Sequence, residues 1–324
     1  MGSAEGAAAE GSEELTEDLE PRAEGMVVGA RLAEQTMTDS RSSYYDKQYN
    51  ARAMIPDHAQ IFQRWKTRSQ EARSRLPCHL DIPYGPSAAE RLDIFPAEGK
   101  SEALLVFIHG GYWRSLDKSD FSYLAPALNR RGVTLALPNY GLCPKVGIED
   151  IVKQNLLAIA WLWHYGVRYG VNPGRLYVAG HSAGGHLTAM MLAARWNAYM
   201  PDLPYNLVKG GLAISGIYDL EPLVQAPFVN ADLKLDRMLA RRLSPVTMPP
   251  ATTAPLYTAV GGDESDELKR QNAFIARAWR YAFAGDIPMP GRNHLTVVEE
   301  LANPDSALFI AALNMMGRLN ISGR

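Results

Sequence analysis

The sequence predicts an α/β fold with a mostly parallel central sheet and helices on both of its faces. Two observations lead to this prediction. Short apolar segments of strand length alternate with longer segments of helical periodicity along most of the chain, and two of the apolar segments end in glycine-rich turns. Continuous apolar strands, without polar alternation, are typical of parallel sheets that are covered on both faces.

The first elements differ from the later ones, because two strands follow one another directly. Residues 57–75 have the spacing of an amphipathic helix, with apolar residues on one side. Strands are expected at 79–84 and 91–95, where β-formers are separated by the turn signal Gly85-Pro86-Ser87.

From residue 104 onward, strands and helices alternate. The segment 104–108 is wholly apolar and predicts a buried strand, and 119–131 has helical spacing. A second apolar strand is expected at 133–137, since Pro138 ends it. The long helix predicted at 148–169 carries its apolar residues on one side.

The same alternation continues to the end of the chain. The turn Asn172-Pro173-Gly174 introduces the next strand. By the same criteria we expect strands at 175–179, 211–215 and 255–260, and helices at 182–195, 265–283 and 306–319. The segment 221–254 between them is rich in proline, and we expect it to form a cap or a long loop over one edge of the fold.

Length and composition fit a single domain over residues 37–324. The chain has 324 residues, and 47% of them are hydrophobic, which is enough to bury one large core. Residues 1–36 are rich in Ala, Gly and Glu and lack aromatic residues, so we expect a disordered acidic leader there. Met37 has the surroundings of a natural start.

Charge and apolar content exclude several classes of partner. The formal net charge of −2 gives no reason to expect binding to nucleic acid. The longest apolar runs are too short to cross a bilayer, and the first residues lack the pattern of a secretory signal. Cys78 and Cys143 fit no metal or redox spacing, so we expect a cytoplasmic protein. A homodimer is left open.

The strand at 175–179 leads into a G-x-S-x-G turn centred on Ser182, and a helix of small residues follows. Glycines two residues before and after the serine permit a tight, strained turn that exposes its hydroxyl. A bare G-x-S-x-G also fits an ordinary turn with an N-capping serine. The apolar strand before it and the helix after it are the context that the catalytic motif requires, so we predict that Ser182 is a nucleophile.

A second glycine-rich turn, His109 to Trp113, follows the strand at 104–108. Adjacent glycines let backbone N–H groups face a site, where each donor to a tetrahedral oxyanion is worth about 2.7–4 kcal/mol. We predict that the amides of Gly111, Tyr112 and Ala183 are these donors. His109 is expected to brace the turn rather than take part in the chemistry.

His294 is the predicted general base for this serine. It is the only histidine after the candidate acids, which gives the order serine, acid, histidine that this arrangement requires. His181 and His186 flank the serine in sequence and are expected to be packed or hydrogen-bonded scaffold.

The acid is expected directly after the strand at 255–260, where four carboxylates compete. Asp266 and Glu267 are expected in the first turn of a helix, where the helix dipole favours acidic residues. The choice between Asp263 and Glu264 is not decided by the local sequence.

These motifs resemble those of the serine-type kynurenine formamidases, or arylformamidases, and their bacterial α/β-hydrolase relatives. The shared segments are HGGYW at 109–113, GHSAGGHL at 180–187, ELKRQ at 267–271 and GRNHLTVVEEL at 291–301. The resemblance implies an α/β-hydrolase fold. It also implies that the acid is Glu264, three residues before the Glu of ELKRQ, with Asp263 in reserve.

The activity that the resemblance implies is cleavage of N-formylkynurenine to kynurenine and formate, without metal or cofactor. A carboxylesterase or an aryl-amide or carbamate hydrolase is the alternative, because both glycine motifs are shared across these enzymes. A non-catalytic binding protein on the same fold is a more remote alternative.

The sequence also predicts an aromatic substrate pocket. Tyr112, Trp113, Tyr140 and Tyr218 each follow the carboxyl end of a predicted strand, where open α/β sheets bind ligands. Arg114 and Arg292 are candidates for binding the amino-acid end of such a substrate.

Overall fold

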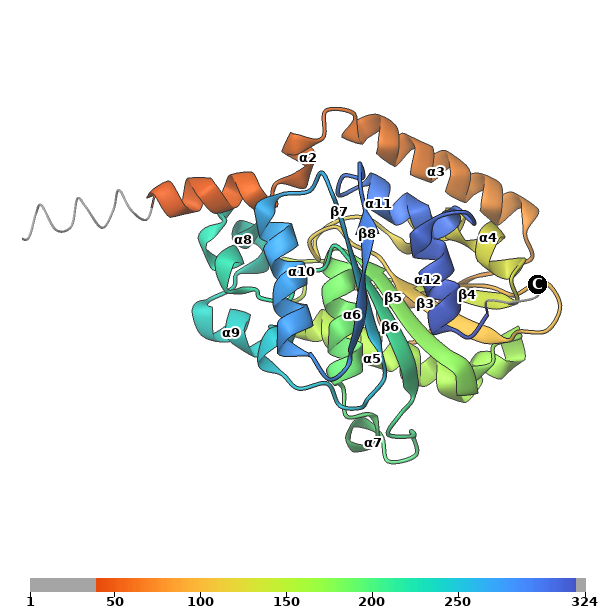
Figure 1. Ribbon diagram of the computed structural model, residues 1–324. Coiled ribbons are helices and arrows are strands. Elements are labelled where there is room, and N and C mark those ends of the chain that lie inside the picture. Colours follow the sequence, from red (N-terminus) through yellow and green to blue (C-terminus); the bar gives the residue numbers. More distant parts are fainter. Residues whose placement is uncertain (1–38, 319–324) are drawn as a thin grey trace, which may run out of the picture. The chain divides into compact units, whose positions relative to one another are not determined.

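The computed structural model describes residues 39–318 of the chain (Figure 1). Contacts divide the chain between Tyr44 and Tyr45, and the unit described below begins at Tyr45. The leader predicted at residues 1–36 lies outside the described residues.

An eight-stranded sheet forms the centre of this unit, in the order β1-β2-β4-β3-β5-β6-β7-β8. Its strands are β1 (His79–Pro83), β2 (Arg91–Phe95), β3 (Ala103–Ile108), β4 (Val133–Pro138), β5 (Leu176–His181), β6 (Val208–Ile214), β7 (Leu256–Gly261) and β8 (Phe283–Met289). The pairs β1–β2 and β2–β4 are antiparallel, and every later pair is parallel. This order confirms the predicted α/β-hydrolase fold with a mostly parallel sheet.

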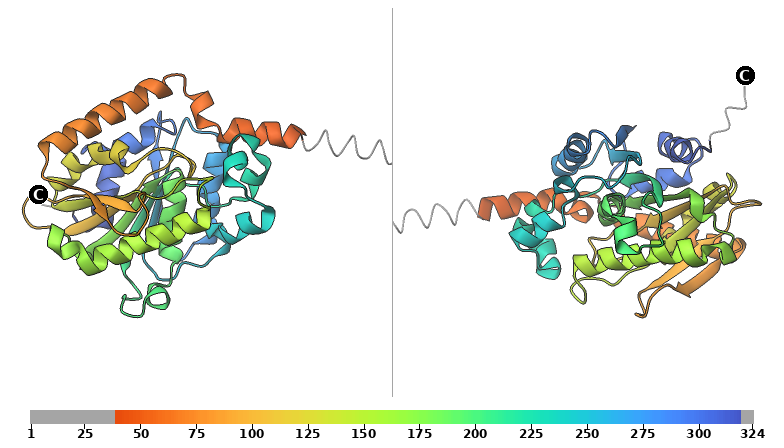
Figure 2. Two further views of the ribbon diagram at one scale, coloured as in Figure 1. Left: turned by 180° about the vertical axis from the view of Figure 1, so that it is seen from behind. Right: turned by 90° about the horizontal axis from the view of Figure 1, so that it is seen from below.

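Helices cover both faces of the sheet (Figures 1 and 2). The longer ones are α3 (His58–Arg75), α5 (Ile148–Tyr165), α6 (Ala183–Ala193), α10 (Asp266–Ala278) and α12 (Ala307–Met315). The shorter ones are α2 (Ala51–Met54), α4 (Ala125–Asn129), α7 (Trp196–Tyr199), α8 (Pro227–Leu233), α9 (Arg237–Arg242) and α11 (Thr296–Glu299). None of the described helices combines the length and the apolar character needed to span a membrane.

Two hydrophobic cores lie on opposite faces of the sheet. Leu104, Val106 and Ile108 of β3 belong to the core that also contains residues of α5, α6 and α10. Leu105 and Phe107 belong to the other core, which contains residues of α3 and α12. Successive side chains of a strand point to opposite faces, so a strand covered on both sides has to be apolar throughout. All of β3 is buried, as its sequence predicts.

Several predicted helices have different bounds in the structure; the helix expected at 148–169, for example, ends at Tyr165 and continues as the 3₁₀ helix η2 (Gly166–Tyr169). The helix expected at 119–131 is a 3₁₀ helix, η1 (Lys118–Leu124), which α4 continues. The helix expected to reach Phe283 ends at Ala278. It ends there because Phe283 pairs with Leu256 and begins the edge strand β8.

The proline-rich segment 221–254 is more regular than a loop. It contains α8 and α9, together with the 3₁₀ helices η4 (Glu221–Gln225) and η5 (Pro245–Thr247). Proline lies in the first turn of η4, α8 and η5, where its missing N–H costs no helical hydrogen bond. Three of the five prolines in this segment therefore start short helices, whereas Pro249 and Pro250 lie in irregular structure.

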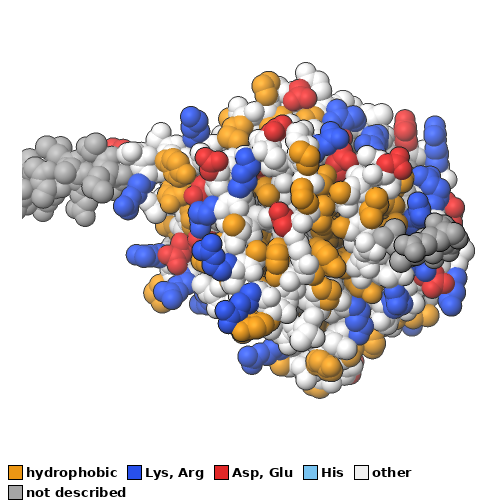
Figure 3. Space-filling model, in the orientation of Figure 1, with side chains coloured by type: hydrophobic (Ala, Val, Ile, Leu, Met, Phe, Trp, Pro, Cys, Tyr) orange, Lys and Arg blue, Asp and Glu red, His pale blue; other side chains and the backbone are white. Residues whose placement is uncertain are grey.

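Charged side chains are mixed on the face that Figure 3 shows. Lys and Arg side chains are interspersed there with Asp and Glu, and they do not gather into one patch. A surface that binds a polyanion needs a cluster of basic residues. This face does not provide one.

Candidate active site

Ser182 occupies a strained turn between β5 and α6. Its backbone has φ 57° and ψ −117°, outside the regions that residues other than glycine commonly adopt. Its amide donates a hydrogen bond of 2.8 Å to the carbonyl of Ile214, the last residue of the neighbouring strand β6. The sheet therefore fixes the conformation of the predicted nucleophile.

The two glycines of the G-x-S-x-G motif are required by close backbone contacts. A Cβ on Gly184 would lie 1.9 Å from the carbonyl oxygen of Ile108, at the end of β3. A Cβ on Gly180 would lie 2.1 Å from the carbonyl oxygen of Gly184. A side chain at either position would collide with backbone atoms. The two glycines therefore allow α6 to begin in direct contact with the end of β3, and they also allow the turn.

The turn that follows β3 presents backbone amides without partners. Gly111 has φ 103°, and a Cβ there would lie 2.1 Å from the carbonyl oxygen of Ser115. Within the described residues, the amides of Gly111, Tyr112 and Ala183 donate no hydrogen bond. Gly111 and Tyr112 line the same cavity as Ser182. Unpaired N–H groups beside a serine are what a developing oxyanion requires.

His109 lies beneath this turn and supports it. Its Nε2 is 3.1 Å from Oδ1 of Asn139, and its ring stacks on Tyr140 with 4.2 Å between the ring centroids. The Tyr140 hydroxyl donates to the carbonyl of His109 at 2.9 Å. Burial lowers the pKa of His109, so the ring remains neutral. These contacts fit the predicted bracing role.

His294 and Glu264 form a buried pair. Nδ1 of His294 lies 2.7 Å from Oε2 of Glu264, and the two side chains are 7% and 0% exposed. The other carboxylate oxygen accepts from the Ser215 hydroxyl at 2.5 Å and from the Gly261 amide at 2.7 Å. A carboxylate only accepts hydrogen bonds, so Nδ1 carries the proton and Nε2 is left as the basic nitrogen.

Asp263, the other carboxylate that the sequence left open, is exposed. Its amide donates to the carbonyl of Arg292 at 3.1 Å. In the described part of the chain, no hydrogen bond or ion pair joins its carboxylate to His294. The geometry therefore brings Glu264, and not Asp263, to the histidine.

His181 is a hydrogen-bonded scaffold residue, as predicted, and its partner is the backbone of His294, which the sequence did not indicate. Its Nε2 lies 2.7 Å from the carbonyl oxygen of His294, and the ring centroids are 4.7 Å apart. Burial, together with the nearby His294, holds the pKa of His181 well below its ordinary value. The neutral ring therefore donates to the carbonyl.

His186 is also scaffold, as predicted. Its Nε2 lies 2.8 Å from the carbonyl oxygen of Leu243, and its ring packs edge-on against Trp113. Burial lowers the pKa of His186 to about 4, so this histidine is neutral at physiological pH. It connects α6 to the segment after α9.

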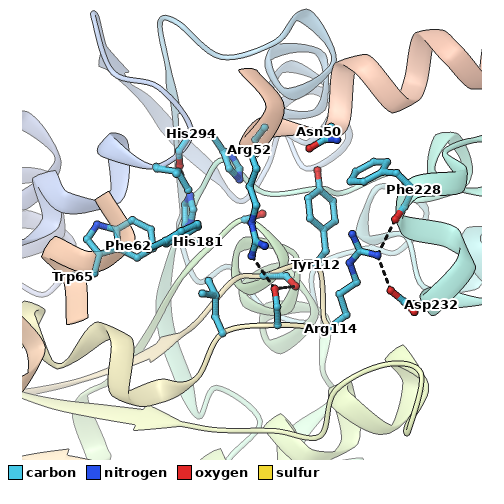
Figure 4. Close-up of a pocket in the computed structure, with 16 residues that line it drawn as sticks. Asn50, Arg52, Phe62, Trp65, Tyr112, Arg114, His181, Phe228, Asp232 and His294 are labelled. Carbon is cyan, nitrogen blue, oxygen red and sulfur yellow. Dashed lines mark hydrogen bonds and ion pairs between the residues drawn. The ribbon is translucent and has the colours of Figure 1, made fainter. Parts of the chain in front are cut away.

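A cavity of about 350 Å³ opens beside Ser182 (Figure 4). Its walls come from α2, α3, α8, the turn after β3 and the two loops that carry Ser182 and His294. Four aromatic side chains contribute to these walls: Phe62, Trp65, Tyr112 and Phe228. The site therefore combines a serine, a histidine, unpaired amides and space suited to an aromatic ring.

Trp113, Tyr140 and Tyr218 do not line this cavity, and the prediction that they do is wrong. Each is at most 1% exposed and belongs to the core on the α5 and α6 face of the sheet. A side chain just beyond a strand end can point into the cleft or down into the core, and the position in sequence does not decide which. The sequence did indicate that Phe62 and Trp65 face the inside of the protein, because both lie on the apolar side of the predicted helix at 57–75.

The two predicted arginines have different surroundings. Arg114 lines the cavity, but its Nη1 lies 2.6 Å from Oδ2 of Asp232. Arg292 is not among the lining residues of the cavity and pairs with Glu300 at 3.0 Å. Among the residues that the structure describes, no cluster of three or more His, Cys, Asp or Glu is arranged to hold a metal ion.

Several known proteins are similar to this chain. The BD-FAE family model matches residues 92–207. A kynurenine formamidase of Salmo salar is 29% identical over 263 residues, which is 78% of this chain and 87% of that protein. A kynurenine formamidase of Drosophila melanogaster is 30% identical over 237 residues, which is 69% of this chain and 76% of that protein.

A solved bacterial structure is also similar. The protein comes from a Silicibacter species and is described as a thioesterase candidate. It is 32% identical to this chain with a TM-score of 0.74, and the match covers 82% of this chain and 97% of that one.

The contact between α6 and β3 can be tested with Gly184→Ala. We expect this variant to lose at least about 1–3 kcal/mol of unfolding free energy, because the new methyl group collides with the backbone of Ile108. Urea unfolding followed by tryptophan fluorescence measures the loss. Gly174→Ala is the matched control, since its Cβ would meet only Asn172 Oδ1 at 3.6 Å. Equal stabilities of the two variants would contradict the argument.

Proposed function

This chain belongs to the kynurenine formamidase family of α/β-hydrolases, and from this premise we propose that it hydrolyses N-formylkynurenine to kynurenine and formate. It is a hydrolase of the α/β fold with formamidase or esterase activity, as its relatives are. One observation supports the proposed mechanism above all others. Ser182 and the Glu264-paired His294 line one aromatic cavity, together with the unpaired amides of Gly111 and Tyr112.

In the proposed reaction, Ser182 attacks the formyl carbon while Nε2 of His294 takes the hydroxyl proton. Glu264 holds the histidine in the required tautomer and stabilises its cation. The amides of Gly111, Tyr112 and Ala183 stabilise the negative charge that develops on the former carbonyl oxygen; we place this oxyanion hole in the turn after β3 and at the start of α6.

The tetrahedral intermediate then collapses and the bond from carbon to the aryl nitrogen breaks. His294 gives its proton to that nitrogen, and the aryl amine leaves. Water, deprotonated by His294, attacks the formyl-enzyme and releases formate, which restores the free serine. The proposed reaction uses side chains and backbone amides of this chain, together with water.

Hydrolysis of an ester or thioester is the second candidate function. The same serine, histidine and amides serve an ester carbonyl, and the Silicibacter relative is described as a thioesterase candidate. An aryl carbamate is a further alternative for the same machinery.

We also propose that the protein works in the cytoplasm, where its two free cysteines would stay reduced. Its partner is a small-molecule substrate. A homodimer and the lack of a nucleic-acid partner stay predictions.

A substrate panel tests the proposed function. We expect kcat/KM for N-formylkynurenine to exceed the values for p-nitrophenyl acetate, an aryl carbamate and an acyl thioester by at least about tenfold, because specificity depends on differential binding of the transition state. Initial rates under identical conditions give the comparison. If the ester or thioester were the preferred substrate, formamidase activity would be excluded as the main function while the hydrolase class remained.

Ser182→Ala tests the nucleophile. The variant should lose about 10⁴-fold or more in kcat for N-formylkynurenine, since the amides and the cavity alone supply only residual catalysis. Formation of the aryl amine measures the rate. Ser74→Ala is the control, because Ser74 is exposed on α3 and bonds only the carbonyl of Glu71. A Ser182→Ala enzyme with the wild-type rate would rule out the acyl-enzyme mechanism.

Glu264→Gln and Asp263→Asn test the acid as a matched pair. Glu264→Gln should lower kcat by about 10⁴-fold, because a neutral amide no longer fixes the histidine tautomer or its charge. Asp263→Asn should stay within about threefold of wild type, since the side chain is exposed. Steady-state rates decide between them, and a larger loss at Asp263 would show that the acid is misassigned.

A further inference from the structure

The cavity beside Ser182 carries one more basic than acidic side chain. Its charged lining residues outside the His294–Glu264 pair are Arg52, Arg114 and Asp232. Arg114 is neutralised locally, because its Nη1 donates to Oδ2 of Asp232 at 2.6 Å and to the carbonyl of Phe228 at 2.7 Å. The positive charge that remains belongs to Arg52.

Arg52 has no carboxylate partner among the described residues. Its Nη2 donates to the Ser115 hydroxyl at 3.1 Å, and its guanidinium carbon lies 5.1 Å from the centroid of the Phe62 ring. A hydroxyl and a ring face leave most of the five guanidinium N–H donors unused and do not neutralise the charge. Burial and the repulsion by Arg114 lower the pKa of Arg52, although a guanidinium stays charged at neutral pH.

The Arg52 side chain extends toward the turn after β3. Figure 4 shows its side chain running from α2 toward the turn after β3, between His181 and Tyr112. The Ser115 hydroxyl that it contacts donates in turn to the carbonyl of Gly111 at 3.0 Å. The guanidinium is thus anchored to the same turn that presents the unpaired amides.

The residues just before α2 hold Arg52 in place. The Tyr49 hydroxyl donates to Glu267 at 2.9 Å and accepts from Gln271 Nε2 at 2.8 Å, which ties this segment to α10. The Tyr112 hydroxyl donates to the carbonyl of Tyr49. A side chain on an anchored element loses less conformational entropy when it binds a ligand.

We propose that Arg52 binds a carboxylate of the substrate, so that the site selects acylated aryl compounds that carry an anionic group away from the scissile carbonyl. Guanidinium and carboxylate match as a two-pronged, charge-assisted pair, and a substrate carboxylate would give Arg52 the charged partner that it lacks among the described residues. This inference rests on the proposed function for the acyl chemistry, and it assigns the specificity to Arg52 instead of Arg114 or Arg292.

Three formamides with the same scissile bond test the proposal. N-formylkynurenine carries both an ammonium and a carboxylate, its decarboxylated amine keeps only the ammonium, and 2-formamidoacetophenone carries neither. Arg52→Gln should raise KM for N-formylkynurenine about 10- to 100-fold with little change in kcat, since it removes a hydrogen-bonded charge pair. The kcat/KM values for the other two compounds should stay within about threefold. Arg52→Lys should fall in between, because it keeps the charge and loses the fork.

Arg237→Gln is the matched control. It removes the same charge from an exposed side chain that pairs with Glu221 outside the cavity, and it should leave all three KM values unchanged. An unchanged KM for N-formylkynurenine in Arg52→Gln would overturn the proposal. An equal loss on all three formamides would also overturn it, since that result indicates a structural role.

Failure of the proposed function has a different signature. The wild-type enzyme would then hydrolyse none of the three formamides while it hydrolysed aryl esters. In that case, wild type and Arg52→Gln are compared on two aryl esters: phenyl acetate, which is neutral, and 4-acetoxyphenylacetate, which carries a carboxylate. A preference for the anionic ester that disappears in Arg52→Gln supports the role of Arg52, and its persistence in that variant overturns it.

Discussion

The start of α6 lies against the end of β3 with no room for a side chain between them, and the candidate site depends on this contact. The missing Cβ of Gly184 lets α6 approach the Ile108 carbonyl, and Gly180 lets the strand approach the helix. On the other side of the contact, a Cβ on Gly110 would lie 2.7 Å from the carbonyl oxygen of His181. Three glycines from two distant motifs therefore bring Ser182 and the turn after β3 into one site.

A second close contact positions the histidine and its acid. The loops after β7 and β8 lie side by side because these strands are parallel neighbours at the edge of the sheet. A Cβ on Gly261 would lie 2.1 Å from the carbonyl oxygen of Arg292. The Asp263 amide bonds that same carbonyl, so the backbone of Asp263 joins the two loops while Glu264 faces inward. The two neighbouring residues thus have different roles: the Asp263 backbone joins the loops, and the Glu264 carboxylate pairs with His294.

The cavity walls and the reactive groups are held by different elements of the fold. Serine, histidine and the unpaired amides are held by turns at the carboxyl ends of strands, whereas the aromatic and charged walls come from α2, α3 and α8. In the proposed reaction, groups held by the sheet attack the scissile bond, and the covering helices select the molecule that fits. This separation is consistent with the different descriptions of similar proteins, one as a kynurenine formamidase and one as a thioesterase candidate.

The sequence by itself determined the parts that depend on local backbone requirements. Apolar strands and glycine turns predicted the fold and the turn around Ser182, because each of these requirements is met within a few neighbouring residues. The order of serine, acid and histidine along the chain singled out His294. The resemblance to known sequences implied Glu264 as the acid, and the tertiary structure shows that Glu264 and not Asp263 reaches His294. The tertiary structure alone decided that His181 supports His294, and that Trp113, Tyr140 and Tyr218 point into the core. It also decided that Arg52 lacks a carboxylate partner among the described residues. These outcomes depend on which distant segments pack together, and the spacing of residues along the chain carries no information about that.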